Sequence, residues 1–173
     1  MKTKRSAALQ ETVVTSERLC LRPMKNEEWK RIVDSVYEND EFLFQFGFEG
    51  DDSYRESLAN PNTEEVIYYS VFQLENSEMI GYVGLSPESN NLEFYVYKEQ
   101  RRNGYATEAI RVFIDACAEG LITGKPHKEF FAGAVHTNDA CVKLLNKLNF
   151  KKTGIGFNIS SGVGFLGFEY AAR

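Results

Sequence analysis

The chain has 173 residues, of which 43% are hydrophobic and 26% are charged, a composition typical of one soluble globular domain. Its 20 Lys and Arg side chains stand against 25 Asp and Glu, and the net charge of −5 argues against nucleic acid as the main partner, which needs a basic face. No apolar run approaches the ~20 residues that cross a bilayer, and the basic N-terminus lacks the apolar core of a signal peptide.

The cysteines are widely spaced, at Cys20, Cys117 and Cys141, with no C-x-x-C pair and no nearby His to complete a zinc set. This spacing favours reduced thiols over a disulfide framework and predicts no metal site. We therefore expect a cytoplasmic protein, neither bound to nucleic acid nor inserted in a membrane.

The charges are distributed unevenly along the chain. Residues 41–93 carry one basic side chain, Arg55, against 11 acidic ones, whereas residues 94–173 carry 11 basic and 7 acidic. The uneven distribution indicates either two different partners or simply a solvated acidic surface.

The N-terminal half predicts a tail, a strand, a helix and a meander. After a poorly ordered tail at residues 1–11, a domain over residues 12–173 would open with a strand at 12–21. Asn26 is placed to cap a helix with apolar positions at i, i+3, i+4, i+7 and i+8. Residues 42–48 are expected to form an aromatic loop with a short helix near 54–58. Runs rich in β-branched and aromatic residues predict strands at 66–74, 79–85 and 92–97.

The C-terminal half predicts two helices alternating with strands. A helix is expected from about residue 105 to 119, then a strand at 129–135, a helix capped by Asn138, and two strands from residue 150 around a turn at 160–162. The order indicates an α/β protein with one mixed sheet covered by helices.

The junction after residue 97 carries the most chemical information. Arg101-x-x-Gly104-x-Ala106 lies where a strand gives way to a helix, and a helix N-terminus offers free N–H groups to an anion. Gly104 permits close backbone approach, while Arg101 and Arg102 add charged donors. The alternative is an ordinary turn with solvated arginines.

Residues 101–109, Arg-Arg-Asn-Gly-Tyr-Ala-Thr-Glu-Ala, resemble the pyrophosphate-binding motif [Q/R]-x-x-G-x-[G/A] of the GNAT N-acetyltransferases. Residues 15–23 resemble the opening strand of the branch that contains ribosomal-protein-alanine N-terminal acetyltransferases, and residues 135–150 resemble its strand-helix-strand segment. The three segments come in family order, in a resemblance that spans residues 12–170.

The resemblance implies a GNAT-like fold with a central, mostly antiparallel sheet of six to seven strands and about four flanking helices. A V-shaped splay is expected between strands 4 and 5, the runs at 92–97 and 129–135. It also implies acetyl-CoA-dependent transfer of an acetyl group to a primary amine, a protein N-terminus or a small molecule, by direct attack in a ternary complex. The positions implied in acetyl-CoA binding are Phe94, Val96, Tyr97, Arg101, Arg102, Asn103, Gly104, Tyr105, Ala106, Thr107 and Asn138.

The catalytic positions are Glu93, Cys141 and Tyr95. Glu93, in the strand beside the expected cleft, is the candidate base, with Tyr82, Tyr95 and His136 in reserve; the alternative is that it faces solvent. Cys141 stands where the branch often has a Ser proposed to protonate the departing CoA thiolate. We expect the helix dipole to lower its pKa. Cys141 has two alternative roles: it packs in the core, or it is the nucleophile of a ping-pong reaction.

The resemblance places the acceptor amine near Trp29, Phe46, Phe48 and Tyr82, and the acidic segment suggests a cationic amine. Besides Cys141, two residues depart from the family pattern: Arg102 occupies a slot that is usually Gly, and Asn149 replaces a Gly while still accepting left-handed geometry. A catalytically silent acyl-CoA-binding module is the alternative function. Monomer and homodimer both stay open.

Overall fold

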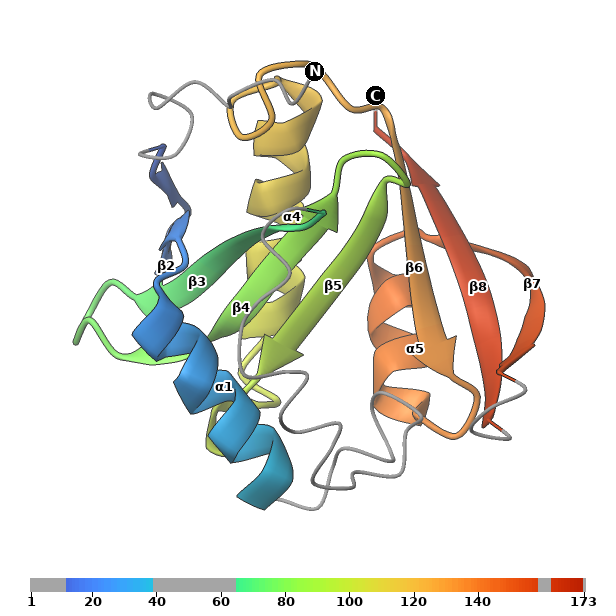
Figure 1. The fold of residues 1–173 in the computed structure, drawn as a ribbon, viewed down its shortest axis with the longest axis horizontal. Helices are drawn as coiled ribbons and strands as arrows, with labels where there is room; N and C mark the ends of the chain where they lie inside the picture. Colours follow the sequence, from blue (N-terminus) through green and yellow to red (C-terminus); the bar gives the residue numbers. More distant parts are fainter. Residues whose placement is uncertain (1–11, 39–64, 159–162, 173) are drawn as a thin grey trace. The chain divides into compact units, whose positions relative to one another are not determined.

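The computed structural model describes residues 12–38, 65–158 and 163–172 (Figure 1). The chain divides into two compact units. The first contains residues 1–24, 63–130 and 171–173, and the second contains residues 25–62 and 131–170. The predicted tail at 1–11, the aromatic loop with Phe46 and Phe48, the short helix near 54–58 and the turn at 160–162 lie outside the described residues. That residues 12–173 form one domain stays a prediction.

The first unit is built on an antiparallel meander. Its strands are β1 (Val14–Thr15), β2 (Leu19–Pro23), β3 (Ile67–Gln73), β4 (Met79–Ser86) and β5 (Asn91–Val96), each paired with the next in antiparallel register. The 3₁₀ helix η2 (Lys98–Gln100) and the helix α4 (Tyr105–Ala118) follow. The strand β6 (Glu129–Val135) begins in this unit and continues into the second.

The helix α4 covers one face of the meander (Figure 1). Because side chains alternate along a strand, Tyr69 of β3 points to this face, and its ring lies 5.6 Å from that of Phe113 in α4. The core of this unit is fully buried and includes Leu19, Leu21, Val71, Val83, Leu85, Ile110 and Phe113. The opposite face carries Tyr68, Tyr82 and Glu93.

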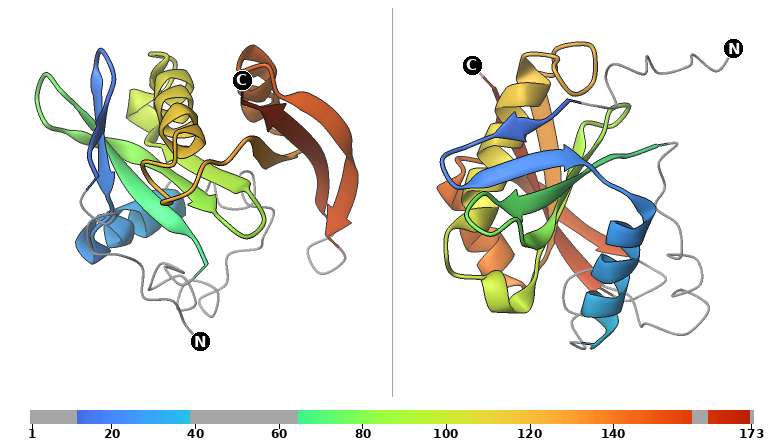
Figure 2. Two further views of the ribbon diagram at one scale, coloured as in Figure 1. Left: turned by 90° about the horizontal axis from the view of Figure 1, so that it is seen from above. Right: turned by 90° about the vertical axis from the view of Figure 1, so that its left-hand side faces the viewer.

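The second unit contains α1 (Asn26–Glu38), the remainder of β6, α5 (Asp139–Lys147), β7 (Lys151–Asn158) and β8 (Val163–Ala171). The strands β7 and β8 form a long antiparallel hairpin (Figure 2), and β8 lies between β6 and β7. Leu145, Leu148, Phe150 and Phe168 are its buried apolar residues near the hairpin and α5.

The helices and strands predicted within the described residues are confirmed with two corrections. The single strand expected at 12–21 is wrong, because residues 16–18 turn the chain between β1 and β2. There the Ser16 N–H donates to the Leu19 carbonyl at 2.9 Å and the Leu19 N–H donates to Ser16 Oγ at 3.2 Å. The split raises the described strands to eight, above the six or seven expected, while three α-helices and one 3₁₀ helix lie in the described ranges.

The second correction concerns the start of α1. Asn26 is the first residue of the helix rather than its cap. The Lys25 carbonyl accepts from the Trp29 N–H at 3.1 Å, and the Lys25 N–H donates to Glu28 Oε2 at 2.9 Å. This is the return half of a capping box, which places Lys25 at the cap.

The Tyr69 hydroxyl gives a test of the meander's packing. It is buried with no hydrogen-bond partner in the described part of the chain, and burial, with a contribution from Cys117, raises the pKa of Tyr69 to about 12. An unpaired buried hydroxyl costs about 1–3 kcal/mol, so Tyr69→Phe should raise the free energy of unfolding by about 1 kcal/mol in urea denaturation. Tyr68→Phe, which loses a hydrogen bond, is the control and should give no gain. A destabilised Tyr69→Phe variant would contradict the assignment.

Candidate active site

The loop between β5 and α4 has an unusual backbone. Arg102 has φ +66° and Gly104 has φ +81°, so two left-handed residues flank Asn103 just before α4 begins at Tyr105. Such alternation turns successive N–H groups to one side, and the first four N–H groups of a helix have no partner within it. The start of α4 therefore offers free N–H groups to an anion. Arg102 and Asn103 are exposed at the surface of the loop.

The two arginines of this loop have different environments. Arg101 Nε donates to the Val96 carbonyl at 2.9 Å, and its guanidinium lies 5.5 Å from the centre of the Tyr95 ring. This contact fixes the loop to the end of β5, a role that the sequence did not predict. Arg102 is exposed and occupies the slot that is usually Gly in the family, and its positive φ explains why Gly is usual there.

A carboxylate lies on the face of the meander opposite α4. Tyr68, Gly84 and Glu93 are directly opposite one another on β3, β4 and β5. Gly84 has no side chain between them; a Cβ there would come within 2.9 Å of the Tyr68 ring. The Tyr68 hydroxyl therefore reaches across β4 and donates to Glu93 Oε2 at 3.3 Å.

Burial raises the pKa of both Glu93 and Tyr68. It raises the pKa of Glu93, and the hydrogen bond from Tyr68 partly opposes the rise. Burial and the neighbouring Glu93 charge raise the pKa of Tyr68 well above its usual range. The rings of Tyr68 and Tyr82 pack edge to face at 5.7 Å, which holds the phenol beside the carboxylate. Glu93 is half-buried, so the alternative that its side chain simply faces solvent does not hold.

The other predicted residues of β5 and of the first turn of α4 are largely packed. Tyr95 is only 2% exposed and lies against Arg101, and the Tyr97 hydroxyl lies 3.8 Å from Met79 Sδ. Phe94, Val96, Tyr105 and Ala106 are half-buried, and Thr107 is buried.

The second unit carries Asn138, Cys141, His136 and Trp29. Asn138 caps α5 as predicted, its side chain accepting from the Cys141 N–H at 3.0 Å. The expectation that the dipole lowers the Cys141 pKa is wrong, because burial raises the pKa of Cys141 to about 11. His136 Nδ1 lies 3.1 Å from the Gly164 carbonyl, and Trp29 is buried in α1. The structure thus places Glu93 and the loop in one unit and these residues in the other.

Asn149 has φ +66°, so the left-handed geometry expected where it replaces Gly is confirmed.

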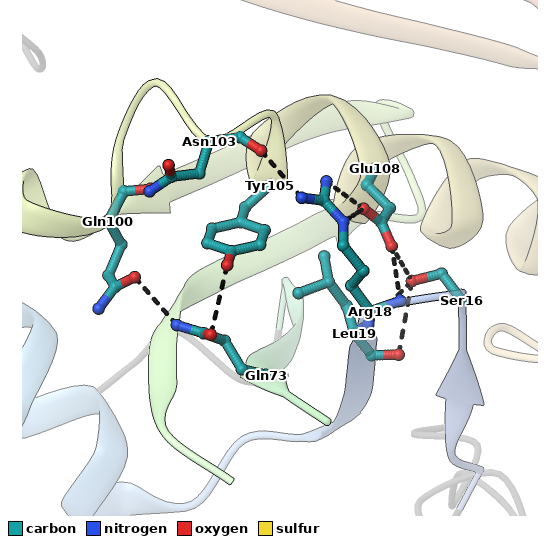
Figure 3. Close-up of polar contacts among 8 residues, drawn as sticks. All are labelled: Ser16, Arg18, Leu19, Gln73, Gln100, Asn103, Tyr105 and Glu108. Atoms are coloured by element: carbon teal, nitrogen blue, oxygen red, sulfur yellow. Dashed lines mark hydrogen bonds and ion pairs between the residues drawn. The ribbon is translucent and has the colours of Figure 1, made fainter. Parts of the chain in front are cut away.

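Sequence reasoning missed four residues that surround the loop or the carboxylate: Arg18, Gln73, Tyr68 and Glu108. Figure 3 shows their polar contacts: Arg18 donates to the Asn103 carbonyl of the loop, and Glu108 holds Arg18. Gln73 bonds to Gln100 and to Tyr105. Arg18 and Glu108 lie within the segments that resembled the family, but nothing in either segment indicates that they meet.

In the described part of the chain, no group of three or more His, Cys, Asp or Glu side chains could hold a metal ion. No helix there is long and apolar enough to cross a membrane.

Comparison with known proteins adds sequence and structural relatives. The fold is similar to a ribosomal-protein-S5-alanine acetyltransferase from Vibrio fischeri, with a TM-score of 0.67, 16% identity, and 93% of this chain and 97% of that chain covered. It is also similar to an acetyl transferase from Salmonella typhimurium that modifies the N-terminal serine of a ribosomal subunit protein, with a TM-score of 0.71, 11% identity, and coverage of 94% and 100%.

A third similar structure is RimL, a ribosomal alpha-N-protein acetyltransferase in complex with coenzyme A, with a TM-score of 0.68, 12% identity, and coverage of 92% and 98%. No curated protein matches the sequence. Residues 18–151 match the acetyltransferase (GNAT) domain, a stretch that includes β5, the loop and α4. The chain therefore belongs to the GNAT acetyltransferase family, and its mixed α/β fold is the fold of that family.

Proposed function

We propose that the protein transfers an acetyl group from acetyl-CoA to a primary amine by direct attack in a ternary complex. The observation that carries the proposal is the loop before α4, in which Arg102 and Gly104 adopt left-handed geometry within the region that matches the family. In this proposal the N–H groups of residues 102–107 bind the pyrophosphate, and the exposed Arg102 adds charge. The coenzyme A complex of the similar RimL structure supports the same cofactor.

The remaining cofactor contacts follow the family resemblance. The backbone of β5 at Phe94 and Val96, and of Tyr97 just after it, would pair with the amides of the pantetheine arm as an added strand does. The Asn138 side chain would contact the cofactor as well as capping α5. Tyr95 is buried, and we assign it to supporting Arg101 at the end of β5.

Glu93 is the proposed general base. The acceptor amine arrives as an ammonium ion and must lose a proton before it attacks the thioester. Burial raises the pKa of Glu93, which makes its carboxylate a stronger base than a solvated one. The Tyr68 hydroxyl, donating at 3.3 Å, orients the carboxylate and partly opposes the rise in its pKa.

Cys141 is the proposed proton donor to the departing CoA thiolate, not a nucleophile. With a pKa of about 11, the thiol is almost entirely protonated at pH 7, and only about one molecule in ten thousand carries the thiolate that covalent catalysis needs. A protonated thiol fits direct attack.

The acceptor is proposed to be cationic, and a protein N-terminus is the class that the similar ribosomal-protein acetyltransferases suggest. The described part of the acidic segment contributes Glu65, Glu75, Glu78, Glu88 and Glu93 without a single Lys or Arg. In this proposal the negative charge of this segment would attract an ammonium ion. A cytoplasmic location is proposed with it.

The proposal is tested by binding and by thiol release. Wild-type protein should bind CoA in a thermal-shift assay, and it should release thiol from acetyl-CoA with at least one member of an amine panel that includes N-terminal peptides, polyamines, aminoglycosides and amino acids. Binding without thiol release for any amine would favour the acyl-CoA-binding module.

Gly104→Glu should abolish CoA binding while the fold is kept. Gly104 is exposed, so the introduced glutamate can be accommodated, and its carboxylate would place a negative charge where the pyrophosphate is proposed to bind. Gly104→Ala is the control: its Cβ would lie 3.5 Å from Arg18 Nη2, an ordinary contact, and the left-handed strain costs only about 1–2 kcal/mol of stability. Undiminished CoA binding by folded Gly104→Glu would refute the site.

The Glu93 assignment predicts a shift in the pH profile. Since the ionised carboxylate is the active form, kcat/KM should rise with pH through a pKa above the ordinary value for Glu. Tyr68→Phe removes a hydrogen bond that lowers this pKa, so the acidic limb should move to higher pH. Glu93→Gln should lower kcat/KM by at least about 10²-fold. Tyr69→Phe, on the other face, is the control; an equal shift there would contradict the assignment.

Replacing Cys141 distinguishes direct attack, in which Cys141 is only a proton donor, from a ping-pong reaction, in which Cys141 is the nucleophile. Cys141→Ala should keep measurable turnover, with a loss of no more than about 10²-fold, the lower end of a general-acid contribution. Cys141→Ser should be at least as active as Cys141→Ala because a hydroxyl can still donate. Complete loss in both variants, with an acetyl-thioester trapped on wild-type protein by mass spectrometry, would instead establish the ping-pong reaction.

A further inference from the structure

Arg18, in the turn between β1 and β2, contacts the loop although more than 80 residues separate them in the sequence (Figure 3). Its Nη1 donates to the Asn103 carbonyl at 3.1 Å. Its guanidinium lies 4.8 Å from the centre of the Tyr105 ring, and its Nη2 is 3.5 Å from the position that a Gly104 Cβ would occupy. One side chain therefore contacts Asn103 and Tyr105 and lies beside Gly104, the residue between them.

Arg18 is itself held by Glu108, in the first turn of α4. Arg18 Nε donates to Glu108 Oε2 at 2.7 Å, and Nη2 lies 2.6 Å from the same oxygen. Glu108 Oε1 accepts from Ser16 Oγ at 2.7 Å and from the Arg18 N–H at 3.0 Å. Burial favours the neutral acid, but these hydrogen bonds and the Arg18 charge outweigh it and lower the pKa of Glu108, which is ionised at neutral pH.

The contact with Asn103 determines the direction of a peptide group. The peptide bond between Asn103 and Gly104 is trans, so its carbonyl and its N–H point to opposite sides. Because Arg18 holds the carbonyl on one side, the Gly104 N–H is turned to the other. Arg18 thus sets the orientation of an N–H group at the beginning of the proposed anion site.

A second contact steadies the loop from β3. The Tyr105 hydroxyl donates to Gln73 Oε1 at 3.3 Å, and Gln73 Nε2 donates to Gln100 Oε1 at 2.9 Å. Gln73 is buried at the end of β3, so this link ties the loop to the core of the first unit. The Tyr105 ring is held at its face by Arg18 and at its hydroxyl by Gln73.

We propose that Arg18 is a positioning residue of the CoA-binding loop, which orients the Asn103–Gly104 peptide for the pyrophosphate. The inference rests on the proposed function. Glu108 neutralises the Arg18 charge, so Arg18 acts through the carbonyl that it holds rather than by attracting phosphate. The residues that would touch the cofactor are those of the loop.

The test compares CoA with a ligand that lacks the phosphates. Arg18→Ala should weaken CoA binding in calorimetry and raise the KM for acetyl-CoA by about tenfold or more, the effect of losing a hydrogen bond to a charged group. At saturating acetyl-CoA, kcat should stay within about twofold of the wild-type value, because the variant weakens CoA binding and leaves the chemical step unchanged. With S-acetylpantetheine as donor, kcat/KM should not change, whereas general damage to the fold would lower it.

Two further variants separate orientation from stability. Arg18→Lys keeps a charge for Glu108 but loses the fixed fork that also reaches Asn103. Its melting temperature should recover toward wild type while CoA affinity stays low. Lys30→Ala removes the exposed pair between Lys30 and Asp34, 2.7 Å long, and should leave CoA affinity unchanged.

The outcomes distinguish this inference from the proposed function. Wild-type affinity for CoA in Arg18→Ala or in Arg18→Lys would overturn the positioning role and leave the proposed function intact. An equal loss of kcat/KM with acetyl-CoA and with S-acetylpantetheine would also overturn it. If wild-type protein binds no CoA, the proposed function itself fails.

Discussion

The left-handed backbone at Arg102 and Gly104 is the constraint on which the first unit depends. It turns the chain from β5 into α4, and a side chain at φ +66° costs about 1–2 kcal/mol. Such strain persists only where the surroundings enforce it. Here the enforcement comes from both ends, through the bond from Arg101 to the Val96 carbonyl and through the contacts of Arg18 with Asn103. The loop is therefore held near both ends by contacts within the first unit.

The meander packs against α4 on one face and carries the proposed base, Glu93, on the other. Tyr69 packs on Phe113 of α4, while its neighbour Tyr68 points the opposite way and donates to Glu93. The alternation of side chains along β3 produces this division, and Gly84 makes the second contact possible by leaving β4 bare between them. A half-buried carboxylate is thus set on a rigid sheet.

Local signals in the sequence predicted most elements and some special backbone positions, among them the cap at Asn138 and the left-handed Asn149. They failed where the determining contact is remote. The pairing of Arg18 with Glu108 spans 90 residues and depends on how β2 lies beside α4. The lowered pKa expected for Cys141 used only the dipole of its own helix, and burial by the surrounding structure reversed the direction.

Burial of Glu93 and Cys141 bears on the choice between direct attack and transfer through an acetyl-enzyme. In Glu93 it raises the pKa of a carboxylate, which makes the group a better proton acceptor. In Cys141 it raises the pKa of a thiol, which keeps the group protonated and removes the thiolate that covalent catalysis requires. The same physical effect therefore supports a base at one position and opposes a nucleophile at the other. Only the second consequence separates the mechanisms, because a base for the amine serves either route, whereas a protonated thiol opposes transfer through an acetyl-enzyme.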